Sequence, residues 1–389
     1  MSSESDIKQD REWPWPFTMP VKRVVIKLGS NLLSSPDGTL DFDRVRIVAR
    51  QIALLRRRGA QVLVVSSGAV AAGMGATKQT TRPTELPRLQ ALAAIGQSQL
   101  MKAYIDAFAP HGLNVAQALI TREDLDDRQR YLNAQYTLET LLTMGAVPVI
   151  NENDTLATEE LSFGDNDMLS AIIAVKISAE LLVILTDIDG LFDAHPTKDA
   201  NAKLIPVVDK VTPQIMSLAT GPGSGVGKGG MVTKVEAARH ATRFGIPTVI
   251  ANGRAENIIT GVLAGDFRGT LFLAEKKRTS RSKARTHWIS ARRPRGTVTI
   301  DQGARHALVD QHRSLLPVGI ISVEGQFARG DVISIAGPHG EELARGLSNF
   351  SAEELSLLKG HRAEEAPALL GKTPPCAEAV HRNNLSMRV

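Results

Sequence analysis

Strand-like runs alternate with helix-like stretches along residues 21–274 of this chain. The segments Val21–Leu28, Gln61–Val65 and Leu181–Thr186 are expected to be strands. The first contains the continuous β-branched run Val24–Ile26, as expected of a parallel strand that is buried on both faces. The stretches Leu89–Phe108 and Arg128–Met144 have the length and hydrophobic spacing of helices. This regular alternation predicts an α/β domain with a mostly parallel sheet and helices on both faces.

Length and composition limit the number of domains and the classes of protein to which the chain can belong. A chain of 389 residues can bury a large core and is expected to hold two or three domains. No apolar run reaches the roughly 18 residues that would suggest a membrane span. Residues 1–20 lack the apolar centre of a signal peptide and are expected to form a flexible extension. Cys376 is the single cysteine, which excludes an intrachain disulfide and fits a cytoplasmic location.

Small and charged residues follow the first two strands, where ligands bind in open α/β sheets. Lys27 ends the first strand and is followed by Gly29 and a hydroxyl residue, which permits close backbone approach to an anion. Ser67 and Gly68 follow the second strand at a helix start, another natural anion site. A solvated lysine and a plain strand-to-helix turn are the simpler structural explanations.

Two clusters of acidic and amide residues lie close together in the sequence. Asp154 ends the segment Asn-Glu-Asn-Asp after a buried strand, and Asn166 and Asp167 end the segment Gly-Asp-Asn-Asp before the apolar helix Met168–Ile177. Either cluster alone is typical of a turn or a helix cap. Together they indicate a site for a polar ligand, cationic or carrying an amine.

A third group of motifs suits nucleotide phosphates. Residues 221–230 contain six glycines and lead into the helix Gly230–Phe244, which carries Thr233 and Lys234. Thr186 and Asp187 end the strand Leu181–Thr186. A flexible surface loop and a capping aspartate are the simpler explanations.

These parts suit phosphoryl transfer between two anions. Such a reaction needs cations around the transferred group, glycines for close backbone contact and carboxylates that position the partners. The sequence shows no zinc-type spacing of His and Cys, and no Gly-x-Gly-x-x-Gly fingerprint follows the first strand. The second absence weakens an oxidoreductase interpretation.

The order and spacing of these motifs resemble the glutamate 5-kinases of the amino-acid kinase superfamily. The resemblance rests on Lys27-Leu-Gly-Ser, Val65-Ser-Ser-Gly-Ala, Val149-Ile-Asn-Glu-Asn-Asp, Gly164-Asp-Asn-Asp, Leu185-Thr-Asp and Gly229-Gly-Met-Val-Thr-Lys. It implies ATP-dependent phosphorylation of the side-chain carboxylate of L-glutamate, which is the first step of proline synthesis. It also implies inhibition by L-proline and a homo-oligomer, either dimer or tetramer.

The resemblance also assigns roles to individual residues. Lys27 and Lys234 would neutralise the transferred phosphoryl group, and Asp167 would organise the two lysines. The side chains of Ser67, Asp154 and Asn166 would bind glutamate. The ATP-binding set would be Lys27, Thr186, Asp187, Lys228, Gly229, Gly230, Met231, Val232, Thr233 and Lys234. No residue is assigned to a protein metal site, because Mg²⁺ would bridge the phosphates of ATP.

This chain departs from the common family pattern in the glycine-rich segment. Lys228 and Val232 stand where the family more often has Thr and Ser. Val232 lacks a hydroxyl that could contact phosphate, whereas Lys228 adds a cation. The departure concerns the details of ATP contact, and the class of reaction is unaffected.

The composition changes after residue 274. Residues 275–295 hold nine Lys or Arg and one acid, which indicates a basic linker. Residues 296–389 carry short alternating strands and resemble a PUA domain followed by a C-terminal tail. RNA binding through these parts, beside an inactive kinase-like domain, is the alternative function. We do not favour it, because only 4% of the residues are aromatic and could stack on bases.

Overall fold

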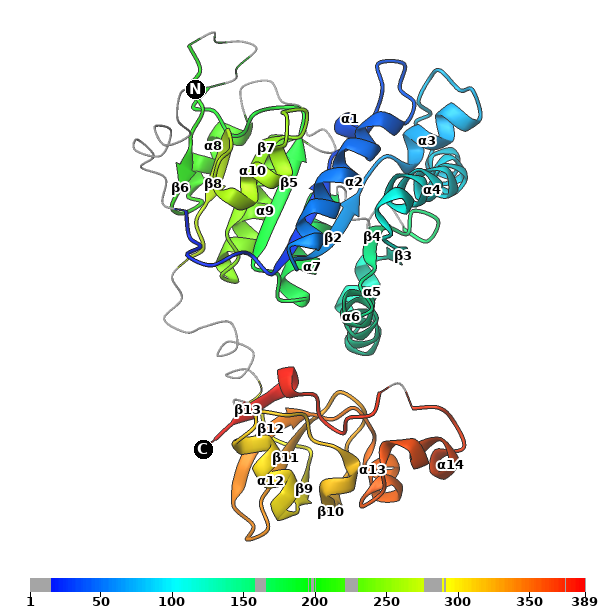
Figure 1. Cartoon of the computed structure of the whole chain (residues 1–389), viewed down its shortest axis with the longest axis vertical. Helices are drawn as coiled ribbons and strands as arrows, with labels where there is room; N and C mark the ends of the chain where they lie inside the picture. Colours follow the sequence, from blue (N-terminus) through cyan, green and yellow to red (C-terminus); the bar gives the residue numbers. More distant parts are fainter. Residues whose placement is uncertain are drawn as a thin grey trace. The chain divides into compact units, whose positions relative to one another are not determined.

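The computed structural model describes residues 15–157, 166–194, 196, 199, 201–220, 230–275, 289, 292–374 and 376–388. The chain divides into two compact units, Met1–Lys276 and Lys277–Val389 (Figure 1). The predicted start of the linker, residue 275, lies close to this division. Neither unit has, among its described residues, a helix that is both long and apolar enough to cross a membrane.

The first unit is built on an eight-stranded sheet with the order β3-β4-β2-β1-β5-β7-β8-β6. Neighbouring strands pair in parallel except for β7 and β8, which are antiparallel. The strands are β1 (Arg23–Leu28), β2 (Gln61–Ser66), β3 (Val115–Ile120), β4 (Val147–Glu152), β5 (Leu181–Thr186), β6 (Val207–Val208), β7 (Thr248–Asn252) and β8 (Gly269–Phe272). The predicted mostly parallel α/β sheet is therefore confirmed.

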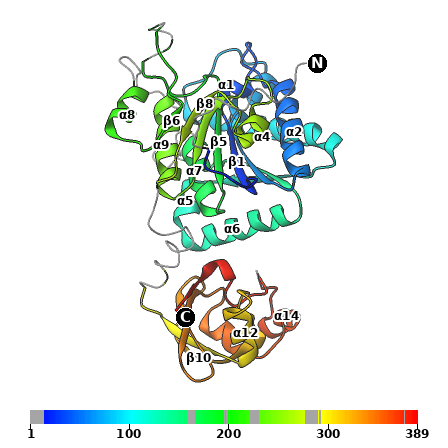
Figure 2. The same ribbon diagram turned by 60° about the vertical axis from the view of Figure 1, so that its left-hand side comes forward.

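Helices cover both faces of this sheet (Figures 1 and 2). They are α1 (Ser30–Leu33), α2 (Phe42–Arg57), α3 (Ala69–Ala76), α4 (Leu86–Phe108), η1 (Ala109–His111), α5 (Arg122–Asp126), α6 (Arg128–Thr143), α7 (Asn166–Lys176), α8 (Pro213–Thr220), α9 (Met231–Arg243) and α10 (Ile258–Ala264). Alternate β1 residues serve opposite faces: Val24 and Ile26 pack with α2 and α4, and Val25 packs with α7 and α9. The two apolar layers fix the central strands and hence the positions of their ends.

Helix α7 begins two residues earlier than the sequence pattern predicts. The expected helix starts at Met168, whereas α7 starts at Asn166 and has Asp167 in its first turn. Asn and Asp are favoured at helix starts because they complement exposed N–H groups and the helix dipole. The earlier start places both side chains at the sheet's carboxyl edge.

The segment predicted as a flexible extension, residues 1–20, is described only from Trp15 onward. The Trp15 ring packs edge-on against Phe17 and Phe267, with centroid separations of 5.3 and 6.0 Å. Trp15 and Phe17 also pack against the core cluster. These two aromatic residues are therefore packed against the first unit, whereas Pro16 and residues 18–20 are exposed.

The second unit contains a five-stranded sheet with the order β10-β9-β11-β12-β13. Its elements are β9 (Gly296–Ile300), α12 (Gln302–Val309), η2 (Pro317–Gly319), β10 (Ile320–Gly325), β11 (Val332–Ala336), β12 (Glu342–Leu347), α13 (Ala352–Leu358), η3 (Ala363–Glu365), α14 (Ala366–Leu370), η4 (Arg382–Asn384) and β13 (Leu385–Met387). Strands β9 and β11 are parallel, and the other pairs are antiparallel. This sheet has its own apolar core, as predicted for a small, mostly β domain.

Candidate active site

The candidate site lies at the carboxyl ends of four neighbouring strands, β4, β2, β1 and β5. Leu28 at the end of β1 is opposite Ser66 on β2 and Leu185 on β5. The polar residues next to these positions are therefore brought to one edge of the sheet. This edge is where ligands bind in open parallel α/β folds.

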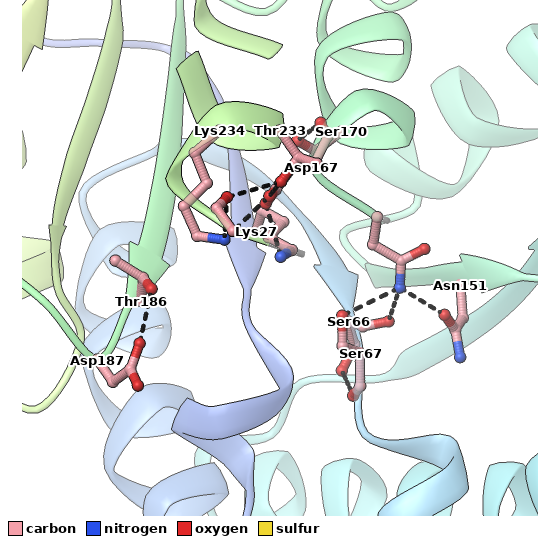
Figure 3. Close-up of polar contacts among 12 residues, drawn as sticks. Lys27, Ser66, Ser67, Asn151, Asp167, Ser170, Thr186, Asp187, Thr233 and Lys234 are labelled. Atoms are coloured by element: carbon pink, nitrogen blue, oxygen red, sulfur yellow. Dashed lines mark hydrogen bonds and ion pairs between the residues drawn. The ribbon is translucent and has the colours of Figure 1, made fainter. Parts of the chain in front are cut away.

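Asp167 is the centre of a buried ionic cluster (Figure 3). Its Oδ1 atom lies 2.6 Å from Nζ of Lys27, and its Oδ2 atom lies 3.1 Å from Nζ of Lys234. The exposed fractions of Lys27, Asp167 and Lys234 are 1%, 0% and 5%. Thr233 donates a further hydrogen bond from Oγ1 to Oδ2 of Asp167, at 2.8 Å. The structure thus brings together all three residues that the sequence analysis proposed as catalytic.

This cluster carries two ammonium groups and one carboxylate. Burying charged groups is costly unless they are paired and hydrogen-bonded, and here one carboxylate serves both cations. The cluster keeps an excess positive charge at the sheet's carboxyl edge. An anion that arrives there is attracted by a cationic pair already held in position, because Asp167 fixes both lysines before the ligand binds.

The start of α9 adds to this positive potential. Lys234 lies in the first turn of α9, and its N-cap residue, Gly230, provides no side-chain cap. The first N–H groups of a helix are a favourable site for phosphate. Thr233 Oγ1 also lies 2.9 Å from the carbonyl oxygen of Gly230, so its single proton is shared between this oxygen and Asp167. The side chains of Met231 and Val232 pack against the apolar core.

A second polar cluster is built from amides and hydroxyls. Asn166 Nδ2 donates to the Ser66 carbonyl oxygen at 2.8 Å, to Ser67 Oγ at 3.2 Å and to Asn151 Oδ1 at 2.8 Å. Ser66, Ser67, Asn151 and Asn166 are all buried. In the view of Figure 3 the Asp167 cluster lies between Ser66, Ser67 and Asn151 on one side and Thr186 and Asp187 on the other.

Helix α4 contacts this second cluster, the amide cluster (Ser66, Ser67, Asn151 and Asn166), through Tyr104. Tyr104 is completely buried, and its hydroxyl lies 2.8 Å from Oγ of Ser66. Ser66 Oγ donates its own proton to the Ser67 carbonyl oxygen at 2.9 Å, so Tyr104 is the donor to Ser66. Burial raises the pKa of Tyr104, although the hydrogen bond with Ser66 acts in the opposite direction. The phenol therefore stays protonated and can donate.

The backbone turn after Ser67 depends on glycine. Gly68 has φ of 102° and is the N-cap of α3. Residues other than glycine rarely adopt this backbone conformation. The turn directs the chain from the end of β2 into α3 and leaves Ser67 at the edge of the sheet.

Asp154 lies in the turn after β4 and is half-buried. Burial raises its pKa above the ordinary value for aspartate, and the nearby Arg82 charge only partly offsets this effect. A carboxylate in such a place gains from a neighbouring cation, because the cation restores part of the solvation that burial removes. Asp154 is therefore suited to bind an ammonium group.

Thr186 and Asp187 lie at the end of β5. Asp187 accepts hydrogen bonds from Asn31 Nδ2 and Thr186 Oγ1, both at 3.0 Å. Burial acts to raise the pKa of Asp187, but these two donors and the charge of Lys234 hold it below its ordinary value. Asp187 is therefore anionic at neutral pH, and its bond from Asn31 ties it to helix α1, which follows β1.

Several predicted residues lie outside the described part of the chain. Lys228 and Gly229 belong to the segment 221–229, and residues 158–165 include the first half of the Gly-Asp-Asn-Asp segment. No role is predicted from the sequence for Asn31, Gln97 or Tyr104. The available signal for Gln97 and Tyr104 was a polar group on the otherwise apolar face of α4. Asn31 could have been found from its place next to the Lys-Leu-Gly-Ser segment.

The donor set does not form a protein metal site. Across the described ranges, no group of three or more His, Cys, Asp or Glu side chains could hold a metal ion. The Asp167 oxygens face Lys27 and Lys234.

Comparisons with known proteins agree with this geometry. The model of the Amino acid kinase family matches residues 22–252, and the PUA domain model matches residues 296–370. Glutamate 5-kinase from Trichlorobacter lovleyi is 49% identical over 366 residues, which cover 94% of this chain and 96% of that protein. Glutamate 5-kinases from Pelobacter propionicus and Geobacter sulfurreducens are 47% and 48% identical, each over 94% of this chain and 97% of the relative. The resemblance seen in the motifs is thereby confirmed, and the chain belongs to the glutamate 5-kinase branch of the amino acid kinase family.

Proposed function

We propose that this chain transfers the terminal phosphoryl group of ATP to the side-chain carboxylate of L-glutamate. The products are L-glutamyl 5-phosphate and ADP, and the reaction is the first step of proline biosynthesis. The observation that carries the proposal is the pairing of Lys27 and Lys234 with opposite oxygens of Asp167, one residue from Asn166. Two buried cations thus lie next to a cluster suited to an amino acid.

The proposed reaction needs charge neutralisation more than proton transfer. A glutamate side chain has an ordinary pKa of about 4.3, so its carboxylate is already ionised at neutral pH and needs no general base. Lys27 and Lys234 would lower the repulsion between this carboxylate and the phosphate as they approach. Asp167 would hold the two ammonium groups in place and offset their mutual repulsion.

The two substrates would lie on opposite sides of this cationic pair. Ser67, Asp154 and Asn166 would bind L-glutamate, with Asp154 facing its ammonium group. Thr186, Asp187 and the segment 228–234 would bind ATP. Mg²⁺ would arrive on the ATP phosphates, where it would screen their negative charge.

The direct test is an assay of the purified full chain with ATP, Mg²⁺ and L-glutamate. We expect glutamate-dependent release of ADP and an equal amount of hydroxamate when hydroxylamine traps the acyl phosphate. ADP release that does not depend on glutamate, or that yields no hydroxamate, would contradict the proposal. L-Aspartate as the better substrate would place the activity in another branch of the family.

Three finer features are also proposed, and their support is the motif resemblance. L-Proline would inhibit by competing with L-glutamate, which is tested by whether saturating glutamate overcomes the inhibition. The chain would form a homodimer or homotetramer, which light scattering measures directly. It would act in the cytoplasm, which fractionation of cells that express the chain would test.

A further inference from the structure

The amide cluster has a fixed direction of hydrogen bonding. A backbone carbonyl oxygen can only accept, so the Asn166 atom that lies 2.8 Å from the Ser66 carbonyl must be Nδ2. This same atom lies 2.8 Å from Asn151, which must therefore present Oδ1. The backbone N–H of Glu152 donates to that oxygen at 2.9 Å and independently requires the same orientation.

Gln97 on α4 is the next member of this series of hydrogen-bonded amides. With Oδ1 of Asn151 turned toward Asn166, Nδ2 of Asn151 points to Gln97 and donates to its Oε1 atom at 2.9 Å. Gln97 is 8% exposed, and its Nε2 atom has no hydrogen-bond partner in the part of the chain that the structure describes. A buried donor without a partner is unfavourable. Turning the Gln97 amide would instead set two donors, Nε2 and Asn151 Nδ2, against each other.

The consequence appears at the other end of this hydrogen-bond series, at Asn166. Both protons of its Nδ2 atom are directed to acceptors inside the protein. Its Oδ1 atom is left as an acceptor with no hydrogen-bond partner among the described residues. Asn166 can therefore offer a ligand an oxygen and cannot offer it a donor. Asp154, the other predicted ligand contact of this kind, also offers only oxygens when ionised.

We propose that Gln97 is a positioning residue which, through Asn151, fixes the Asn166 amide so that its oxygen accepts from the ammonium group of the amino-acid substrate. This inference rests on the proposed function and deepens it, since it assigns recognition of the ammonium group to the pair Asn166 and Asp154. The substrate carboxylates would be left to Ser67 and the lysines.

The test compares two replacements of Gln97 in the full chain. Gln97→Met keeps the length and apolar stem but removes the acceptor, whereas Gln97→Glu keeps an acceptor oxygen in either protonation state. We expect Gln97→Met to raise KM for L-glutamate about tenfold, with kcat and KM for ATP changed less than about threefold, because the weakened contact is a hydrogen bond to a charged group. We expect Gln97→Glu to keep KM for L-glutamate within about threefold of the parent, because its acceptor remains.

Two outcomes would overturn the inference. One is a KM for L-glutamate in Gln97→Met that equals that of the parent chain. The other is a Gln97→Glu variant that is as impaired as Gln97→Met, which would mean that Nε2 and not Oε1 is the important atom. If Gln97→Met does not fold, Gln97→Leu, which also removes the acceptor, takes its place in the comparison with Gln97→Glu. An unmodified chain without glutamate-dependent activity would instead contradict the proposed function itself.

The matched control is Gln99→Met on the same helix. Gln99 is exposed, so this change alters helix composition equally and leaves the amide cluster intact. We expect no change in KM for either substrate. A rise in KM for L-glutamate equal to that of Gln97→Met would assign the effect to α4 as a whole and overturn the inference.

Discussion

Asn166 and Asp167 are adjacent residues whose side chains belong to two different polar clusters. Asn166 binds Ser66, Ser67 and Asn151, whereas Asp167 binds Lys27 and Lys234. The first turn of α7 therefore joins the proposed amino-acid site to the proposed phosphoryl site. Two consecutive residues of one helical turn thus contact both clusters.

Replacing Asp167 tests its place at the centre of the ionic cluster. Asp167→Asn leaves two buried ammonium groups without their carboxylate, so we expect the free energy of unfolding to fall by about 3–5 kcal/mol. Urea denaturation at neutral pH measures this change. Thr233→Val removes one hydrogen bond to the same carboxylate oxygen and leaves both ion pairs in place, so it is expected to cost about 1.5–2 kcal/mol. A smaller loss for Asp167→Asn than for Thr233→Val would contradict the assignment.

Replacing either lysine tests charge neutralisation. Lys27→Met and Lys234→Met keep much of the apolar stem and leave Asp167 paired with the other lysine. We expect kcat to fall about 100-fold to 1000-fold, a typical loss when one preorganised group is removed from a site of developing charge. Steady-state kinetics with saturating ATP and L-glutamate checks this.

Lys102→Met is the matched control for the lysine variants. Lys102 is paired with Asp106 on the exposed side of α4, and its side chain is 69% exposed. We expect kcat to stay unchanged. A loss for Lys234→Met no larger than that for this control would remove Lys234 from the mechanism.

The raised pKa of Asp154 predicts a dependence on pH. Because burial makes the pKa of Asp154 higher in the folded chain than in the unfolded chain, ionised Asp154 destabilises the ligand-free fold above that pKa. We therefore expect Asp154→Asn to increase stability at neutral pH, with the difference shrinking as pH falls through the Asp154 pKa. Thermal unfolding of both chains between acidic and neutral pH measures this.

The same replacement should impair binding of L-glutamate. At neutral pH we expect KM for L-glutamate to rise about tenfold or more in Asp154→Asn, because a hydrogen bond between charged groups is lost. In the parent chain, affinity should also fall with pH as Asp154 becomes protonated, beyond the loss due to the substrate's own carboxylate. A variant with the parent's KM, or with the same pH profile, would exclude Asp154 as the ammonium contact.

Gly96 tests the packing that holds the turn after Ser67. A Cβ atom at Gly96 would lie 1.8 Å from the Ala69 carbonyl oxygen and 2.3 Å from the Gly73 nitrogen. Backbone atoms must move to admit it, so we expect Gly96→Ala to cost about 3 kcal/mol or more of unfolding free energy. Ser98→Ala on the exposed face of α4 should change it by less than about 0.5 kcal/mol. Equal stabilities of the two variants would contradict this close approach of α3 and α4.

The sequence allowed the sheet and the ends of its strands to be predicted. The predicted strands Val21–Leu28, Gln61–Val65 and Leu181–Thr186 follow from local sequence patterns, and the observed strand order brings their ends together. The start of α7 was missed by two residues, because the polar Asn166 and Asp167 interrupt the apolar pattern used to find the helix. This error is small in length but concerns both central side chains of the site.

The partners of the site residues could not be predicted in the same way. Gln97 and Asn151 are 54 positions apart, and Asn166 and Ser66 are 100 positions apart. Such contacts depend on how α4 and α7 pack against the sheet, which local sequence patterns do not specify. The direction of the hydrogen bonds between these amides also depends on the Ser66 carbonyl oxygen, whose position is set only in the folded protein.

The proposed phosphoryl transfer to the glutamate carboxylate is tested most directly by following one oxygen atom. L-Glutamate labelled with oxygen-18 in its side-chain carboxylate is incubated with the purified chain, ATP and Mg²⁺, and the acyl phosphate is then cleaved with hydroxylamine. If the carboxylate attacks the terminal phosphorus of ATP, the released phosphate carries one labelled oxygen, which mass spectrometry detects. Release of unlabelled phosphate alone would show that water is the acceptor and would contradict the proposed reaction.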